Sequence, residues 1–340
     1  MTPLLSVIIP TLNEGRNIER LLDELLGQED VSLEIIVADG GSSDKTREKA
    51  CRPGVRLVTS APGRGCQMNA GAGTASGDWL LFLHADSSLT DSSQLARSIA
   101  VLSACATEKV AGHYPLHFQT RDPGLSRQMR FFEEKSRLNR AGTWNGDQGL
   151  MIAADLFRLT GGFTEKLPFL EDQEFGRRFA SMGRFITLPD SLITSARRFE
   201  QEGFRERVTL NAMIMGMFHL SHEGFFDKAP GVYQANDGTS RLLLLPFYSL
   251  VRRAVFDQGA ITGLKRCYAI GQYTAENLWQ ASFRLGVAGN RTSEMLDRHD
   301  RWFEPLLNNP FGYLLGTLLT LSWFHFTELA LLIRRGRSRE

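Results

Sequence analysis

Four short apolar runs that alternate with helical segments constrain the fold of this sequence more than any other feature. The runs read LLSVIIPTL from residue 4, LEIIVAD from residue 33, VRLVTS from residue 55 and WLLFLHAD from residue 79. Apolar, β-branched stretches of this length predict buried strands. Helical patterns lie between them, beginning near Asn17, after Asp44 and over residues 63–75. Strands that alternate with helices predict an α/β fold with a doubly wound, mainly parallel sheet.

Polar residues follow three of these runs, at the points where the strands should end. They are Asn13-Glu14 after the first run, DGGSSD at residues 39–44 after the second, and His84-Ala85-Asp86 at the end of the fourth. Ligands of open α/β sheets bind outside the carboxyl ends of the strands, so we expect these residues to meet at one edge of the sheet. Asn13 and Asp44 could equally cap the helices that follow them, a role that does not exclude ligand contact.

The composition is that of an ordinary globular protein. With 340 residues, 42% of them hydrophobic, the chain can bury a large core and carry an appended region. A formal net charge of +1 gives no general attraction for nucleic acid, so we expect no nucleic-acid partner. The four cysteines have no C-x-x-C spacing and are expected to be free thiols in a reducing compartment. The N-terminal stretch lacks the features of a signal peptide, so we expect a cytoplasmic catalytic domain.

The stretch GAGTASG at residues 71–77 superficially resembles a dinucleotide-binding fingerprint. That fingerprint must follow a strand and open a helix. Here the stretch closes a predicted helix and precedes a predicted strand. The interpretation as a dehydrogenase therefore loses its main support.

The segments SVIIPTLNE and EIIVADGGSSDKT resemble the family 2 glycosyltransferases, over about the first two-thirds of the chain. The resemblance implies the GT-A fold, a nucleotide-binding α/β domain with a metal-binding D-x-D motif. By position, it implies nucleotide-site roles for Pro10, Asn13, Glu14 and Asp39. Most relatives carry two acidic residues before the glycine-serine turn, and here Gly40 replaces the second.

Three further residues match the nucleotide-binding part of this family. Arg64, in PGRGCQMNAG, stands where the family places a basic or glycine-rich segment beside the nucleotide. Asn69 and Gly71 match the start of the family's N-x-G pattern.

A narrower resemblance is to a bacterial subgroup known as radical-SAM/selenodomain-associated transferases. It rests on residues 62–89, on GDQGLMI and on TSARRFE. In that subgroup a histidine replaces the first aspartate of D-x-D, so His84-Ala85-Asp86 is implied to form the metal and diphosphate edge. A carboxylate oxygen suits a hard cation, so Asp86 is the stronger candidate ligand for Mg²⁺ or Mn²⁺. His84 could be a second ligand, a hydrogen-bond donor or a structural residue.

The resemblance also implies a catalytic base in the segment GGFTEKLPFLED, which ends at Glu171-Asp172. The base of the family is the aspartate of an E-D pair after a GGF turn, which here is Asp172 with Glu171 beside it. Two acids at a helix N-terminus are also favourable for the helix dipole alone. Asp147, in NGDQG, could bind sugar hydroxyls or serve as a turn residue. Arg198, in SARRFE, could bind the diphosphate or be a solvated basic residue.

The last third of the chain has a different composition, in which basic residues alternate with aromatic residues and leucines. This pattern predicts amphipathic helices that lie at a membrane surface or pack on the catalytic domain. We expect a catalytic domain at residues 1–225 and a helical region at 226–340. Residues 311–333 are apolar and long enough to span a bilayer, yet include His325 and Glu328 and precede a basic tail. A hairpin, an interfacial helix or a homo-oligomer interface fits better than one complete span.

These expectations combine into one functional hypothesis. The chain should be an inverting, metal-dependent glycosyltransferase that uses a nucleotide-diphosphate sugar and an unidentified acceptor, which could be lipid-linked. It should associate with the inner face of the cell membrane. A nucleotidyltransferase of related fold and a noncatalytic nucleotide-sugar-binding module are the alternatives.

Overall fold

The computed structural model describes residues 3–105, 108–234 and 241–337. The chain divides into two compact units, Met1–Ala196 and Arg197–Glu340. We expected a boundary at residue 225, but α8 (Arg197–Glu202) and α9 (Phe204–His219) belong to the second unit, because α9 packs on later helices of that unit. How far the catalytic function extends along the chain stays a prediction.

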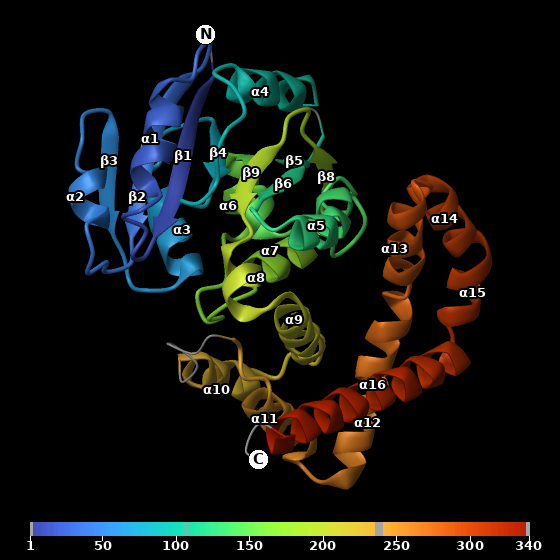
Figure 1. The fold of residues 1–340 in the computed structure, drawn as a ribbon. Helices are drawn as coiled ribbons and strands as arrows, with labels where there is room; N and C mark the ends of the chain where they lie inside the picture. The colour runs from blue at the N-terminus through green and yellow to red at the C-terminus, as the bar shows by residue number, and fades with distance from the viewer. Residues whose placement is uncertain (1–2, 106–107, 235–240, 338–340) are drawn as a thin grey trace. The chain divides into compact units, whose positions relative to one another are not determined.

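A mainly parallel sheet forms the centre of the first unit (Figure 1). Its seven strands within the described residues run in the order β3 (Val55–Thr59), β2 (Ser32–Asp39), β1 (Leu4–Thr11), β4 (Trp79–Phe82), β7 (Leu150–Ala153), β5 (Val110–His113) and β8 (Arg184–Thr187). β7 is antiparallel to both of its neighbours, and the other pairs are parallel. Strands β6 (Leu116–Gln119) and β9 (Leu192–Ser195) form a second, parallel pair. The predicted α/β sheet is confirmed.

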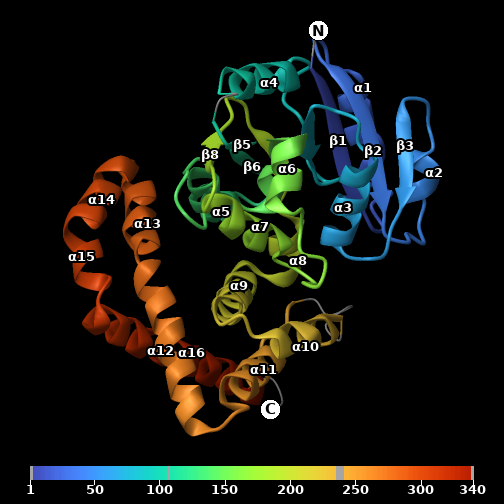
Figure 2. The same ribbon diagram turned by 180° about the vertical axis from the view of Figure 1, so that it is seen from behind.

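Helices cover both faces of this sheet. α1 (Ile18–Leu26) lies over one face in Figure 1, and α3 (Arg64–Thr74) and α6 (Ala154–Thr160) lie over the other in Figure 2. The other helices of the unit are α2 (Thr46–Ala50), α4 (Gln94–Ala104), α5 (Pro123–Lys135), the 3₁₀ turn η1 (Gly146–Gln148) and α7 (Glu171–Ala180). The helix predicted from about Asn17 is α1, and its four fully buried residues, Ile18, Leu21, Leu22 and Leu25, form one apolar stripe.

The packing of α3 and α7 positions the candidate site. A Cβ atom on Gly71 of α3 would lie 2.5 Å from Cγ2 of Ile8, so this glycine lets α3 approach β1 closely. Phe175 and Phe179 of α7 are fully buried in the core cluster that includes Phe82 at the end of β4. The start of α3 and the start of α7 are thereby held against the same face of the sheet.

The second unit is helical in its described residues. It contains α8, α9, α10 (Glu223–Gln234), α11 (Leu245–Phe256), α12 (Ala260–Glu276), α13 (Trp279–Gly289), α14 (Thr292–Arg298), the π-helix η2 (His299–Phe303), α15 (Glu304–Leu307) and α16 (Pro310–Arg337). A Cβ atom on Gly316 of α16 would lie 2.1 Å from the carbonyl oxygen of Gly271 in α12. The two backbones touch at these glycines, and the predicted C-terminal helical region is confirmed.

Candidate active site

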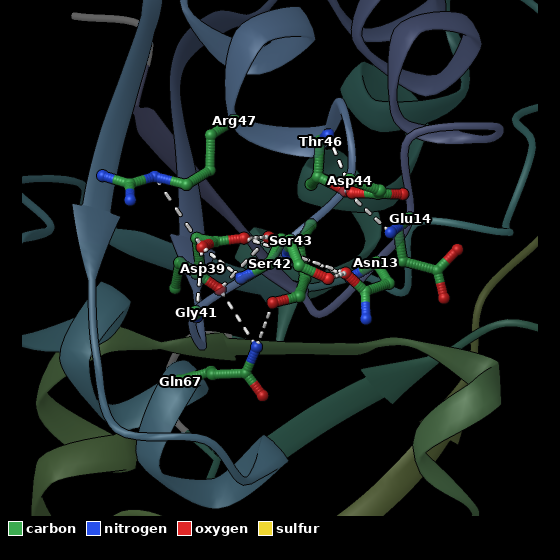
Figure 3. A network of polar contacts seen from close by, with 12 residues as sticks. Asn13, Glu14, Asp39, Gly41, Ser42, Ser43, Asp44, Thr46, Arg47 and Gln67 are labelled. Atoms are coloured by element: carbon green, nitrogen blue, oxygen red, sulfur yellow. Dashed lines mark hydrogen bonds and ion pairs between the residues drawn. The ribbon is translucent and has the colours of Figure 1, made fainter.

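Asp39 ends β2 and is fully buried by its own loop. Its Oδ1 accepts hydrogen bonds from the amides of Gly41 (3.1 Å) and Ser42 (3.0 Å), and its Oδ2 accepts from Ser42 Oγ (2.5 Å) and Thr11 Oγ1 (3.2 Å) (Figure 3). Burial alone would raise the pKa of Asp39, but the hydrogen bonds from Ser42, Gly41 and Thr11 outweigh it and lower that pKa. Asp39 therefore organises the loop that follows β2.

The loop after β1 is tied to the loop after β2. Asn13 has a positive φ of 58°, and its side-chain oxygen accepts a hydrogen bond from the amide of Ser43 at 2.9 Å. The amide of Glu14 donates to Thr46 Oγ1 at 2.8 Å, and Asp44 accepts from the amide of Gly15 at 3.0 Å (Figure 3). Asn13 does not cap α1, because Asn17 occupies the N-cap position.

Pro10, Glu14 and Asn69, which were expected at the nucleotide site, each contact neighbouring residues of the first unit. Pro10 is buried within β1, next to Ala38 of β2. The Glu14 carboxylate accepts a hydrogen bond from Asn17 Nδ2 at 2.8 Å. The Asn69 carboxamide donates to the Phe163 carbonyl at 2.8 Å and accepts from the Phe163 amide at 2.9 Å. Asn69 thus ties α3 to the glycine-containing turn that leads to α7.

His84, which follows β4, and Asp147, which lies in η1, form a polar pair. Nδ1 of His84 lies 3.2 Å from Oδ1 of Asp147, and the imidazole is mostly buried whereas the carboxylate is exposed. Burial and the nearby charge of Arg64 disfavour the charged imidazole, but the hydrogen bond to Asp147 and the negative charges of Asp147 and Asp86 together outweigh them, so the pKa of His84 is raised. The structure therefore leaves Nε2 as the imidazole nitrogen that could meet a ligand.

Asp86 lies two residues further along, after the buried Ala85. Among the described residues, no donor forms a hydrogen bond to the Asp86 carboxylate, although Arg64 interacts with it electrostatically. Within those residues, no group of three or more His, Cys, Asp or Glu side chains is arranged to hold a metal by itself. A single available carboxylate fits a cation whose other ligands come from a diphosphate and water.

Glu171 and Asp172 begin α7 and face different partners. Oδ2 of Asp172 accepts a hydrogen bond from the amide of Gly146 at 2.6 Å, so its carboxylate lies beside η1. Glu171 is only 1% exposed, and its carboxylate lies 3.6 Å from Nε of Arg64. Burial raises the pKa of Glu171; Arg64 opposes this shift, Asp172 adds to it, and the net shift is upward. Asp172 is thus the more accessible acid of the pair.

The fold brings these side chains together from distant parts of the sequence. Burial disfavours the charged Arg64, yet Glu171, Asp147, Asp172 and Asp86 together raise its pKa. A small, partly open cavity of about 10 Å³ lies beside His84, Glu171 and Asp172, and its other lining residues are Met68, Phe82, Trp144, Gly146, Leu150 and Phe163. Arg198, in contrast, lies in α8 of the second unit, and its expected role stays a prediction.

One supporting network escaped the sequence reasoning. Gln148 is fully buried, and its Nε2 donates to Nδ1 of His113 (2.8 Å) and to the Ser136 carbonyl (2.8 Å). Its Oε1 accepts from the amide of Asn145 at 2.9 Å, which closes η1 as a capping box. Gln148 thereby fixes the turn that carries Asp147. The only signal in the sequence was a polar residue two positions before a strand, which does not identify its partners.

Comparison with known proteins identifies the family to which part of this chain is similar. The family model described as Glycosyl transferase family 2 matches residues 6–153. These residues belong to glycosyl transferase family 2. The family expected from the sequence is therefore confirmed, whereas the narrower subgroup stays a prediction.

Individual relatives match parts of the chain. A PGL/p-HBAD biosynthesis glycosyltransferase of Mycobacterium tuberculosis (strain ATCC 25177 / H37Ra) is 38% identical over 107 residues, which cover 29% of this chain and 42% of the relative. Glycosyltransferase AglE of Haloferax volcanii is 26% identical over 205 residues, which cover 56% of this chain and 66% of AglE. The chain thus matches less than half the length of the mycobacterial relative.

A solved structure shares the fold. The mannosyltransferase PcManGT from Pyrobaculum calidifontis, in complex with GDP-Man and Mn²⁺, has a TM-score of 0.50 and 18% sequence identity. The match covers 95% of this chain and 88% of that chain. Together with the family match and the sheet order, it confirms the GT-A-type fold of the family 2 segment.

Proposed function

We propose that this protein is a glycosyltransferase that moves a sugar from a nucleotide-diphosphate donor to an acceptor with inversion, in a single displacement. The observation that carries the proposal is the convergence of Asp172, Arg64, His84 and Asp86 at one site of the first unit, whose residues 6–153 match glycosyl transferase family 2. The carboxylate of Asp172 can accept a proton there, Arg64 and His84 supply cationic or polar groups, and Asp86 supplies an available carboxylate. This combination suits the departure of a diphosphate.

Asp172 is the proposed general base. It would remove the proton of the acceptor hydroxyl while that hydroxyl attacks the anomeric carbon. The amides of Gly146 (2.6 Å) and Gln173 (2.7 Å) hold its two carboxylate oxygens in place. Glu171 is buried against Arg64, so its proposed role is to position that guanidinium.

The proposed diphosphate site consists of Arg64, His84 and Asp86. Arg64 and Nε2 of His84 would donate hydrogen bonds to phosphate oxygens, which are strong acceptors. Asp86 would hold Mg²⁺ or Mn²⁺; as the alternative to donating to phosphate, a neutral His84 would be the second ligand through Nε2. When bound, the cation would neutralise part of the charge that develops on the leaving diphosphate. Pro10, Asn13, Glu14, Asp39 and Asn69 would shape the nucleotide side of the site.

We also propose that the second unit binds the inner face of the cell membrane, near an acceptor that could be lipid-linked. Residues Pro310–Arg334 of α16 are long and apolar enough to cross a bilayer. The helix nevertheless has a polar side: Glu328 pairs with Arg252 of α11, and Thr320 lies 2.7 Å from Thr274 of α12, oxygen to oxygen.

The other side of α16 is apolar and exposed. Phe311 is 85% exposed and Phe326 is 76% exposed, and several leucines of the helix are about half exposed. A helix with one polar, packed side and one apolar, open side suits an interfacial position better than a complete span. Association with a second copy of the chain is the alternative use of this surface.

Transfer and hydrolysis assays with a panel of nucleotide sugars, with and without Mg²⁺ or Mn²⁺, test the proposed activity. We expect metal-dependent release of a nucleoside diphosphate by the wild-type protein. Binding of nucleotide sugars without turnover would identify a noncatalytic module. Release of pyrophosphate from a nucleoside triphosphate and a sugar phosphate would identify a nucleotidyltransferase.

A further inference from the structure

Gln67 lies in the second turn of α3 and points toward the ends of β1 and β2. Its side chain is almost completely buried, with the residue 3% exposed. Nε2 donates to the carbonyl oxygens of Thr11 (2.5 Å) and Ala38 (3.3 Å) (Figure 3). Because both partners are carbonyls, the atom that faces them must be the amide nitrogen. Both hydrogens of this nitrogen are therefore used by the strand ends.

The oxygen of the same carboxamide has no such partner. No described residue donates a hydrogen bond to Oε1 of Gln67, and Figure 3 shows this oxygen on the side that faces away from the two carbonyls. Among the described residues, the side-chain oxygens that are both fully buried and without a hydrogen-bond partner are Ser87 Oγ and Ser88 Oγ. Oε1 of Gln67 also lacks a partner but is not one of these atoms, so it keeps some access to solvent. A nearly buried acceptor that lacks a donor is costly unless a ligand or water supplies one.

The absence of a side chain at residue 40 makes room for this carboxamide. A Cβ atom on Gly40 would lie 3.0 Å from Nε2 and 3.1 Å from Cδ of Gln67. In the pattern of the resembling family an acidic residue stands here, and such a side chain would occupy the place of the Gln67 amide. The neighbouring Asp39 already accepts four hydrogen bonds from its own loop and Thr11. Gln67 is therefore the group at this position with a free acceptor.

We propose that Gln67 determines nucleotide specificity by accepting a hydrogen bond from a ring N–H of the nucleobase. This inference rests on the proposed function and assigns its donor class. Uracil, thymine and guanine carry a ring N–H on their pairing edge, at N3, N3 and N1, whereas cytosine and adenine carry a ring acceptor there. An acceptor-only oxygen favours the first group, because a mismatched base would leave two acceptors facing each other.

Calorimetric titration of the whole protein tests the assignment with ligands that differ at one atom. The probes are UDP with 3-methyl-UDP and GDP with 1-methyl-GDP, and inorganic pyrophosphate reports on the phosphate site alone. For the preferred nucleotide, we expect methylation of the ring nitrogen to weaken wild-type binding about tenfold or more. In Gln67→Ala, the parent and the methylated nucleotide should bind within about twofold of each other, with pyrophosphate affinity unchanged.

A second variant moves the carboxamide without removing it. Gly40 does not have a left-handed φ, so Gly40→Ala is compatible with the backbone, and its Cβ would displace Gln67. This variant should also lose most of the discrimination against the methylated base. Gln28→Ala is the matched control: its amide similarly bridges backbone groups, Asp91 O at 2.8 Å and Leu95 N at 3.1 Å, in a different loop. The control should discriminate as the wild type does.

The outcomes separate this inference from the proposed function. If the wild type binds no nucleoside diphosphate, the proposed function fails. If the wild type binds one but tolerates methylation, or if Gln67→Ala retains the discrimination, only the role of Gln67 is overturned. Should Gln67→Ala fail to fold in a thermal unfolding control, unchanged discrimination by Gly40→Ala would overturn the role in the same way.

Discussion

Nδ1 of His84 lies 3.2 Å from Oδ1 of Asp147, so the imidazole at the proposed diphosphate site is held by a carboxylate from a separate turn. This pair orients the imidazole and leaves Nε2 available. The two residues come from segments that follow β4 and precede β7, which are neighbours in the sheet. The contact therefore depends on strand pairing.

The His84–Asp147 pair should act as a unit in donor binding. We expect His84→Ala and Asp147→Ala each to lower kcat/KM for the nucleotide sugar, and the double variant to lose less than the sum of the two losses. The coupling should be on the order of 1 kcal/mol, as for groups in direct contact. Steady-state kinetics of the four proteins measure it. Strict additivity would mean that the pair is not maintained during binding.

Asp86 should be essential for metal-dependent turnover. Asp86→Ala removes the available carboxylate, and we expect a rate loss of roughly a hundredfold or more. The half-saturating Mn²⁺ concentration should rise in Asp86→Asn, which retains the size of the side chain. Undiminished activity in Asp86→Ala would remove the metal assignment, and a larger loss in His84→Ala would make the imidazole the principal group.

Asp172 should act in the chemical step. Asp172→Asn should lower transfer by roughly a hundredfold or more, the loss typical of a missing general base, and leave nucleotide affinity nearly unchanged. Glu171→Gln is the informative comparison, because it should weaken diphosphate binding through Arg64. If affinity collapsed together with rate in Asp172→Asn, Asp172 would be a binding residue.

His113 should make the folded protein sensitive to acid. Burial lowers the pKa of His113 despite the hydrogen bond to Asn139, and its Nδ1 accepts from Gln148 at 2.8 Å. Because the folded-state pKa lies below the unfolded value, this contribution to stability is present above about pH 6.5 and is lost as the pH falls through the folded-state pKa.

Urea unfolding at pH 7.5 and pH 5 measures this effect. His113→Gln should be less stable than the wild type at pH 7.5, and the difference should shrink at pH 5. His117→Gln, whose side chain is 65% exposed, serves as the control for the substitution itself and should lose less stability than His113→Gln at pH 7.5. An equal loss of stability at both pH values for His113→Gln would contradict the assignment.

The exposed side of α16 should bind anionic lipid. Phe326→Glu places a charge on a residue that is 76% exposed, and we expect co-sedimentation with anionic vesicles to fall about tenfold or more. Nearby basic residues contribute on the order of 1 kcal/mol each, so wild-type binding should also weaken with salt.

Leu159→Glu is the matched control for that experiment, because Leu159 is 61% exposed on α6 of the first unit. It should sediment as the wild type does. If the wild type stays in solution with vesicles but forms an oligomer that Phe326→Glu dissociates, the surface is a self-association interface. Labelling that finds the tail and the catalytic unit on opposite membrane sides would instead show that α16 spans the bilayer.

The sequence alone determined the first four strands, the helices between them and the edge at which the polar residues after these strands were expected to gather. The apolar run at Leu4–Thr11 and the stripe on Ile18–Leu26 are recognisable because burial imposes a period on neighbouring residues of one element. Asp86 is singled out because it follows a predicted strand, whereas Asp172 is singled out by the resemblance to the family's E-D pair.

Only the tertiary structure decided which side chains meet. Gln67 fills the space left by Gly40, and His84 pairs with Asp147, because the order of strands and the conformations of the loops place these residues together. Asn13, a possible helix cap in the sequence, instead binds the amide of Ser43. Such partners depend on distances between elements that no local pattern encodes, so candidate site residues could be named from the sequence but their pairings could not.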